Sequence, residues 1–372
     1  MWKLKQILTY AVLPLLMGAY CQSTQAERIP PADNHQVVNL TYDKSSPPAD
    51  VYIWNLASGG YDTDDGPLWS RNTWHCLSDT VPDTGQCRTN YMWGYDAVVN
   101  NGLKLKFTEQ RSRLSSVINL TGSRYILSNA LYGPWRMESA NYVQGSYEAK
   151  LSVWIPSAEL ARLPTGGIWK ARLVLKELQW TPVRPPVATF SADITLNVTD
   201  RNNGAIYLPA FGSATPRVDL NLRTRPLSTS PGGEVSGQAN IDMCLYDGYN
   251  SNSPWLKVTL SDLMSIPGRP SDIFSVTRDG TGGATAADRV DYRVAMTYNN
   301  QPRAMNNSQA MTLSGVNTAL IRPVVLPGIA FPVVCTPAPL TLDVLPFAKL
   351  SKAAGHFSGT LRVTLAADAL AP

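Results

Sequence analysis

Strict alternation of apolar and polar residues is the strongest pattern in the sequence. Every second residue from Phe190 to Val198 is apolar, and the residues between them are polar. Successive side chains of a β-strand point to opposite faces of a sheet, so this pattern predicts a strand with one buried face. The same alternation occurs at 147–155 and 171–175. A chain built from such segments has to fold into sheets that each cover a core on one side.

The second half of the chain continues the pattern. Alternating segments occur at 218–222, 241–245, 256–260, 290–296 and 340–344. Glycine, proline, asparagine and aspartate separate the segments, and one short helical turn is expected at 157–163. Parallel strands require crossover connections, and no crossover helices are visible in the sequence. We therefore predict an all-β protein made of antiparallel sandwiches.

The length of 372 residues is sufficient for two domains. A polar, turn-rich stretch at 200–204 follows the strong strand pattern that ends at Val198. This stretch predicts a first domain at 27–199, a short linker at 200–203 and a second domain at 204–372.

The first 26 residues have the layout of a secretory signal peptide. Lys3 and Lys5 precede an apolar stretch from Ile7 to Ala19, and small polar residues then lead to Ala26. The stretch is too short for a membrane-spanning helix. We expect cleavage after Ala26, and Cys21 is then removed with the signal.

Four cysteines remain after this cleavage, and an even number is typical of an oxidising compartment. Three pairings are possible. We favour Cys76–Cys87 with Cys244–Cys335, because this pairing keeps each disulfide within one half of the chain. Zinc binding is the alternative, but neither spacing resembles a C-x-x-C motif.

Composition and motifs argue against several classes of function. The formal net charge is +4 and the basic residues are scattered, so no nucleic-acid partner is expected. Three histidines lie far apart, and no G-x-S-x-G motif is present. The glycine-rich segment 280–283 lacks the P-loop lysine, and the acidic turn 62–66 departs from a calcium loop. We expect no metal, cofactor or enzymatic activity, although a pair of carboxylates in a cleft, as a glycosidase needs, cannot be judged from sequence.

Aromatic residues and an arginine are concentrated in a loop-rich part of the first half. This group includes Trp69, Trp74, Tyr91 and Trp93, together with Arg71. Rigid rings and a planar guanidinium are common in binding surfaces because they bury area at low entropic cost. The opposing interpretation is that most of these rings belong to the core, where tryptophan is usually found.

Two long strings carry a resemblance to a known family. These are IPSAELARLPTGGIW at 155–169 and the run from PRVDLNL to NIDMCLYDGY at 216–249. They resemble the CblD-like pilus biogenesis initiator family, which includes the CfaE-type tip adhesins of class 5 (alternate chaperone–usher) fimbriae. VTDRNNGAIYLPAF at 198–211 and LKFTEQRS at 105–112 fit the same family, so the resemblance covers most of the chain.

The resemblance implies two tandem immunoglobulin-like β-sandwich domains at a fimbrial tip, on the cell surface. The first would bind a host glycan or glycoprotein receptor. The second would be an incomplete pilin domain, completed first by a periplasmic chaperone and then by the donor strand of the major pilin at the outer-membrane usher. The alternating segment near the C-terminus could border such a groove through Phe357, Leu361, Val363 and Leu365.

Residues 27–36 contain Pro30, Pro31 and Asp33 and make a poor donor strand, because proline lacks the N–H that a ladder requires. A subunit that accepts a donor strand but offers none belongs at the tip of the fibre.

The family also implies candidate receptor-binding residues. In CfaE-type adhesins an arginine lies five residues before the first cysteine of the first domain, and Arg71 has this spacing from Cys76. Trp69 and Trp74 are its aromatic neighbours. The family's adjacent arginine pair is absent: the corresponding stretch begins Lys176-Glu177, so Arg184 is the expected substitute and Glu177 is expected to alter the charge. The alternative is a purely structural initiator that caps the fibre without binding a receptor.

Overall fold

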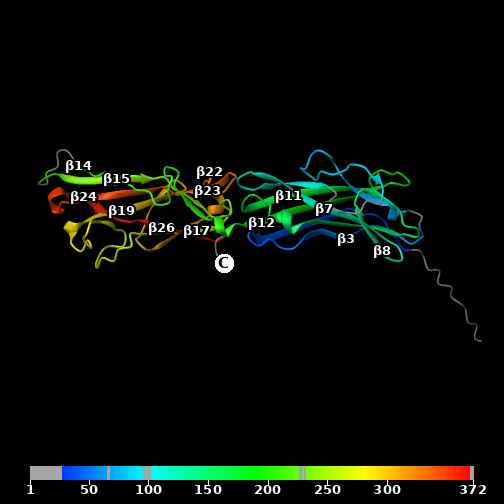
Figure 1. The fold of residues 1–372 in the computed structure, drawn as a ribbon, viewed down its shortest axis with the longest axis horizontal. Helices are drawn as coiled ribbons and strands as arrows, with labels where there is room; N and C mark the ends of the chain where they lie inside the picture. Colours follow the sequence, from blue (N-terminus) through cyan, green and yellow to red (C-terminus); the bar gives the residue numbers. More distant parts are fainter. Residues whose placement is uncertain (1–26, 65–67, 95–101, 226–228, 230–231, 369–372) are drawn as a thin grey trace, which may run out of the picture.

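The computed structural model describes residues 27–368 except for 65–67, 95–101, 226–228 and 230–231. Two β domains lie end to end, with the first domain on the right of Figure 1 and the second on the left. Among the described residues, no helix has the length and apolar character needed to cross a membrane.

The first domain is a sandwich whose halves share one long strand, β7 (Ser115–Leu127). The first half of β7 pairs with β6 (Leu103–Glu109), and its second half pairs with β10 (Glu148–Ile155). The remaining strands are β1 (Arg28–Ile29), β2 (Asn34–Asp43), β3 (Val51–Asp62), β4 (Asn72–Cys76), β5 (Met92–Trp93), β8 (Leu131–Arg136), β9 (Ser139–Ala140), β11 (Gly167–Gln179) and β12 (Ala188–Thr199). Inward-facing residues of both halves form one core, which includes Leu105, Leu151 and Phe190. The expected helical turn is α1 (Ser157–Leu160).

Two strand pairings differ from the antiparallel prediction. The two-residue strands β5 and β9 pair in parallel, and so do two long strands. Strand β2 runs parallel to β12 from Asn34↔Phe190 to Asp43↔Thr199. A parallel pair needs a long connection, which a crossover helix usually supplies. Here the rest of the first domain forms that connection, so no helix is needed.

Strand β11 organises one half of the sandwich. One edge of β11 pairs with β12 from Gly167 to Glu177. Its other edge is divided between two strands, because β6 pairs only at Trp169 and Lys170, whereas β4 pairs from Leu175 to Gln179. The loop between Cys76 and Cys87 lies in the gap, where the Val174 N–H donates to the Thr84 carbonyl at 2.9 Å.

The second domain packs two groups of strands around a second core. The larger sheet contains β14 (Arg223–Arg225), β15 (Glu234–Ile241), β24 (Leu340–Ala348), β19 (Arg289–Tyr298), β18 (Phe274–Arg278), β25 (Phe357–Ser358) and β20 (Gln301–Ala304). Opposite it are β21 (Ala310–Ser314), β17 (Trp255–Ser261) and β26 (Arg362–Ala367), with β13 (Ala205–Tyr207), β16 (Cys244–Tyr246), β23 (Val333–Pro337) and β22 (Arg322–Val324) near the junction. Short 3-10 turns η2 (Arg201–Asn203), η3 (Ala286–Asp288), η4 (Val316–Thr318) and η5 (Lys349–Ser351) connect them.

Three strand predictions in this domain need correction. The segment predicted at 241–245 is divided between two strands, because β15 ends at Ile241 and β16 begins at Cys244. Two further corrections concern residues 216–222 and the C-terminal segment. Residues 216–222 form no strand, although Val218 and Leu220 pack against the core. The predicted C-terminal strand is interrupted at 359–361, between β25 and β26. Both segments border an open groove, described below, so they lack the neighbouring strand that would complete their backbone ladders.

The two favoured disulfides are present. Cys76 is bonded to Cys87, and Cys244 is bonded to Cys335. The first closes the loop beside β11, and the second joins β16 to β23.

The two domains meet end to end (Figure 1), and hydrogen bonds join them at the junction. The Asp200 N–H donates to the Gly248 carbonyl at 2.9 Å. Asn250 Nδ2 donates to the Gly166 carbonyl at 2.6 Å, and Asn252 Nδ2 donates to Glu109 Oε1 at 3.0 Å. These bonds leave very little space between the two backbones.

We expect Gly166→Ala to disturb this junction selectively. A Cβ at this position would lie 2.0 Å from the Gly248 oxygen, so the backbones would have to separate. Scanning calorimetry should show a loss of about 1–3 kcal/mol, the usual cost of overpacking. Gly212→Ala is the matched control, because its Cβ would meet nothing within 4 Å. Equal stability of the two variants would contradict this description of the junction.

Candidate functional site

The first domain has its candidate binding residues at the end far from the second domain. Strand β11 begins beside the junction at Gly167 and ends at Gln179, about 40 Å away along an extended strand. The turn η1 (Trp69–Arg71) precedes β4, and Asn72 pairs with Gln179. The Trp180 N–H donates to the Arg71 carbonyl at 3.3 Å. Arg71 therefore lies at the far end of the domain, beside the loop 180–187.

Arg71 takes part in a continuous series of cation–π and ring contacts. Its guanidinium carbon lies 4.7 Å from the centre of the Tyr142 ring and 5.5 Å from that of Trp180. The Trp180 ring contacts Trp93 edge to face at 5.1 Å, and Trp93 contacts Tyr91 at 5.7 Å. We call these five residues the distal ladder. Trp180 is 7% exposed and Trp93 is 66% exposed, so the ladder extends from a buried ring to an exposed indole.

A buried arginine fixes the backbone beneath the distal ladder. Arg124 on β7 has no exposed surface. Its guanidinium donates to the carbonyls of Ser70 and Asn72, which flank Arg71, and to those of Ser139 and Asn141, just before Tyr142. Burial lowers the pKa of Arg124 to about 9, so the side chain remains charged at neutral pH. One cation thus ties together the segments that carry two members of the ladder.

The other predicted receptor residues have different positions. Arg184 is exposed on the loop 180–187, and Trp69 is half-buried in η1. Trp74 cannot contact a receptor: it is 0% exposed and packs edge to face on Phe190 in the core. The prediction for Trp74 is wrong because β4 is buried along its whole length, and the Trp74 side chain is part of the core of the first domain.

Glu177 does not alter the surface charge as expected. Its side chain has no exposed surface and accepts a hydrogen bond from Asn72 Nδ2 at 2.8 Å. Burial raises the pKa of Glu177 to about 8, against the opposing effect of the Asn72 bond. The carboxyl is therefore largely neutral at pH 7 and faces the core.

Sequence reasoning missed Tyr142 and Trp180 as partners of Arg71. Trp93 was within the aromatic group, but its high exposure was not apparent from the sequence. Tyr142 is far from Arg71 in the sequence. Strand pairing and the hydrogen bonds of Arg124 bring the two residues together in the fold. A spacing pattern contains no such information.

The second domain has an apolar groove of about 950 Å³. Leu361, Val363 and Leu365 line it as predicted, and Val218 and Leu220 lie among the other lining residues. Phe357 instead packs partly buried against the core and is not among the lining residues. The groove therefore lies between β26 and the unpaired segment 216–222.

The acidic turn 62–66 is described only at Asp62, Thr63 and Asp64, because residues 65–66 lie outside the described residues. Asp62 is 1% exposed, and its Oδ1 lies 3.6 Å from Arg28 Nε. Within the described part of the chain, no cluster of three potential metal ligands occurs.

We expect Glu177→Gln to change the pH dependence of folding stability. At low pH the Glu177 carboxyl is protonated in both the folded and the unfolded protein. As pH rises from 4.5 towards 8, only the unfolded chain loses this proton. The stability of the wild type therefore falls relative to that of the variant. The difference in free energy of unfolding should grow by at most about 1.4 kcal/mol per pH unit within this window and then level off.

Urea denaturation at several pH values measures this difference. Glu27→Gln, which changes an exposed carboxyl, is the matched control. A difference that does not vary between pH 5 and 8 would show that Glu177 is ionised in the folded protein.

Two family descriptions match nearly the whole chain. The first domain of CfaE, a subunit of CFA/I fimbriae, matches residues 23–201, and its second domain matches residues 204–369. The CfaE fimbrial protein of Escherichia coli is 28% identical over 376 residues, covering 97% of this chain and 98% of the relative.

Solved structures agree with this similarity. The crystal structure of CfaE, the adhesive subunit of CFA/I fimbria of enterotoxigenic Escherichia coli, has a TM-score of 0.77 at 25% identity and covers 91% of this chain and 93% of that one. A chaperone–tip adhesin complex of CFA/I fimbriae has a TM-score of 0.67 at 25% identity and covers 90% and 97%. With both domains matched in order, the chain belongs to the CfaE family of CFA/I fimbrial subunits.

Proposed function

We propose that this protein is the adhesive tip subunit of a chaperone–usher fimbria, exposed at the cell surface. The observation that carries the proposal is Arg71 held between the Tyr142 and Trp180 rings, with the open Trp93 indole two contacts away. The similar CfaE structure is described as an adhesive subunit, which supports the same role here.

The distal ladder suits a host glycan or glycoprotein. An exposed indole offers a flat apolar face on which a sugar ring can stack. A guanidinium offers several N–H donors to hydroxyl or carboxylate oxygens. Rings on both sides of Arg71 hold its side chain in place, so binding costs less conformational entropy. Exposed Arg184 adds positive charge on the adjoining loop.

The groove in the second domain supports assembly by donor-strand complementation. A strand from the major pilin would lie beside β26 and fill the apolar surface of Leu361, Val363 and Leu365. Before that step a periplasmic chaperone would occupy the same groove, and transfer would take place at the outer-membrane usher. A chaperone bound to a tip adhesin occurs in the similar CFA/I complex.

The N-terminal segment supports placement at the tip. Arg28 and Ile29 pair with β3, and the strand that starts at Asn34 pairs with β12. These residues are already part of their own domain and are therefore not available as a donor strand. We propose further that residues 1–26, which lie outside the described residues, are a cleaved signal, and that the functional domains are 27–199 and 204–372 with 200–203 as linker.

The rival proposal is a structural initiator without receptor binding. The absent arginine pair favours it, but buried Glu177 adds little negative charge to this end of the domain at neutral pH. The open Trp93 favours adhesion, because an indole that is 66% exposed contributes little to stability.

We expect Arg71→Ala and Trp93→Ala each to weaken binding to host cells about tenfold or more, as truncation of a central contact does. The protein would carry a donor peptide of the major pilin at its C-terminus, because an open edge promotes aggregation that resembles adhesion. Arg113→Ala, an exposed arginine near the junction, is the matched control. Binding to cells and to a glycan array measures the effect.

Saturable binding that survives both substitutions would remove the distal ladder from the proposal. A stable, monomeric wild-type fusion that binds neither cells nor glycans would favour the structural initiator.

We expect Val363→Lys to impair complementation without affecting the first domain. A charged side chain in the apolar groove would have to be desolvated when the donor strand binds. Complex formation with the chaperone and with a donor peptide should weaken at least tenfold in a pull-down. Val325→Lys, which makes the same change at an exposed position outside the groove lining, should bind normally. If Val363→Lys binds the chaperone and the donor peptide normally, the donor strand does not occupy this groove.

A further inference from the structure

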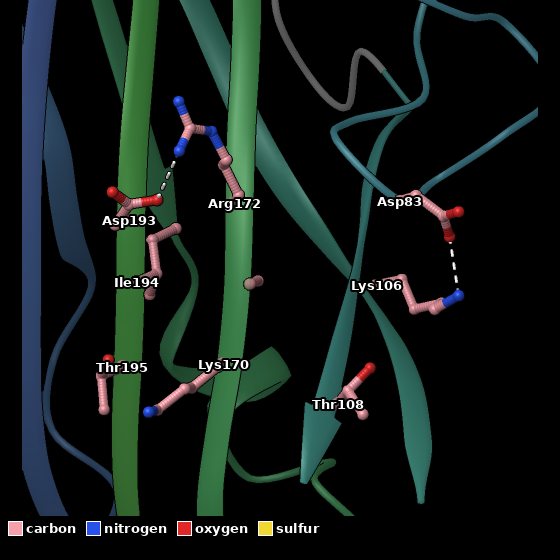
Figure 2. Close-up of a pocket in the computed structure, with 9 residues that line it drawn as sticks. Asp83, Lys106, Thr108, Lys170, Arg172, Asp193, Ile194 and Thr195 are labelled. Carbon is pink, nitrogen blue, oxygen red and sulfur yellow. Dashed lines mark ion pairs between the residues drawn. The ribbon is translucent and has the colours of Figure 1, made fainter. Parts of the chain in front are cut away.

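A hollow of about 460 Å³ opens on the outer face of the first domain, away from the distal ladder. It forms where β6 and β11 separate after the Thr108↔Lys170 pair. Lys106 and Thr108 come from β6, Lys170 and Arg172 from β11, and Asp193 and Thr195 from β12. Asp83, on the loop closed by the first disulfide, completes the lining (Figure 2). We call this the sheet-face hollow.

Most charges in the sheet-face hollow are already paired. Lys106 Nζ lies 2.7 Å from Asp83 Oδ1, and Arg172 Nη1 lies 3.5 Å from Asp193 Oδ1. Lys170 is exposed and, within the described part of the chain, has no ion pair. Figure 2 shows its side chain extending towards Thr195, with Thr108 on the other side of the opening. The hollow therefore offers one unpaired cation between two hydroxyls.

The chemistry of the lining selects a class of ligand. Lys170 is positioned for a single anionic group. The Thr195 hydroxyl can donate or accept, and the Thr108 hydroxyl keeps a lone pair beside its hydrogen bond with Ser115 Oγ at 3.3 Å. Asp193 also lies 3.6 Å from His35 Nε2, and each carboxylate oxygen has a second lone pair that can accept from a sugar hydroxyl. The volume is within the usual range of small-ligand sites. A sugar ring with several hydroxyls and one acidic substituent matches this set of donors and acceptors.

We propose that the sheet-face hollow is a second glycan site, which binds an acidic sugar residue through Lys170, Thr108 and Thr195. It is separate from the distal ladder, because Lys170 and Gln179 are about 30 Å apart along β11. The proposal therefore does not depend on receptor binding at Arg71. A second, anion-dependent contact would let one tip subunit hold two parts of a branched glycan.

The test uses the full chain with its groove filled by the fused donor peptide, and with the distal ladder disabled by Arg71→Ala and Trp93→Ala. Ligand-observed NMR titrations compare lactose, 3′-sialyllactose and 3′-sulfolactose, which share a core and differ in the acidic group. We expect the two acidic ligands to bind more tightly than lactose, and the comparison between them separates a carboxylate from a sulfate preference.

In that background Lys170→Ala should weaken binding of the acidic ligand at least fivefold and leave lactose unchanged. Thr195→Val keeps the side-chain shape and should weaken it severalfold. Lys176→Ala is the matched control, since Lys176 is exposed on the same face of β11, outside the hollow.

Two results would overturn the proposal. One is acidic ligands that bind no better than lactose once the distal ladder is disabled. The other is an equal loss from Lys170→Ala and Lys176→Ala, which would indicate diffuse charge attraction rather than a site. The two proposals can be told apart. If Arg71→Ala and Trp93→Ala leave binding to cells unchanged but Lys170→Ala still weakens binding of the acidic ligand, the distal ladder is not a receptor site and the second glycan site remains supported.

Discussion

The divided pairing along one edge of β11 determines where both candidate sites of the first domain lie. Because β6 leaves this edge after Lys170 and β4 joins it only at Leu175, the edge has a gap that one loop has to bridge. The loop meets β11 through a single described hydrogen bond, from Val174, and a disulfide closes it. On one side of the gap is the sheet-face hollow. On the other side, β4 leads back to Arg71 at the far end of the domain.

The distal ladder depends on an unusually polar interior. Arg124, Asn72 and Glu177 lie in the core within one network, in which Asn72 accepts from Arg124 through its carbonyl and donates to Glu177 through its side chain. Burying a cation is costly unless several acceptors surround it. Four backbone carbonyls meet this need for Arg124, and two of them, those of Ser70 and Asn141, belong to a turn and a loop rather than to a strand. The network thus orders irregular segments that apolar packing alone would leave free to move.

Sequence patterns predicted the fold much better than the site. Alternation at 190–198 predicted β12, because a strand pattern depends on local spacing. The number and positions of the cysteines predicted both disulfides, because only three pairings had to be compared. The pattern failed at 218–222, where an apolar face is present but a neighbouring strand is not. For the site, the resemblance to the CfaE-type adhesins pointed to Arg71, whereas Trp74, which was assigned to the receptor surface, lies in the core. Tyr142 and Trp180 could not be linked to Arg71, since their proximity results from tertiary hydrogen bonds between distant segments.

The topology also explains why such a subunit occupies only one position in a fibre. A polymer built by strand donation needs each subunit to accept one strand and to offer another. Here the residues that could be offered are fixed by the parallel β2–β12 pair, whose ten register pairs span the first domain. The accepting groove is in the second domain, whereas the distal ladder is at the opposite end of the first. In the proposed assembly, growth therefore proceeds from the second domain, and every subunit added there leaves the distal ladder at the far end of the first domain uncovered.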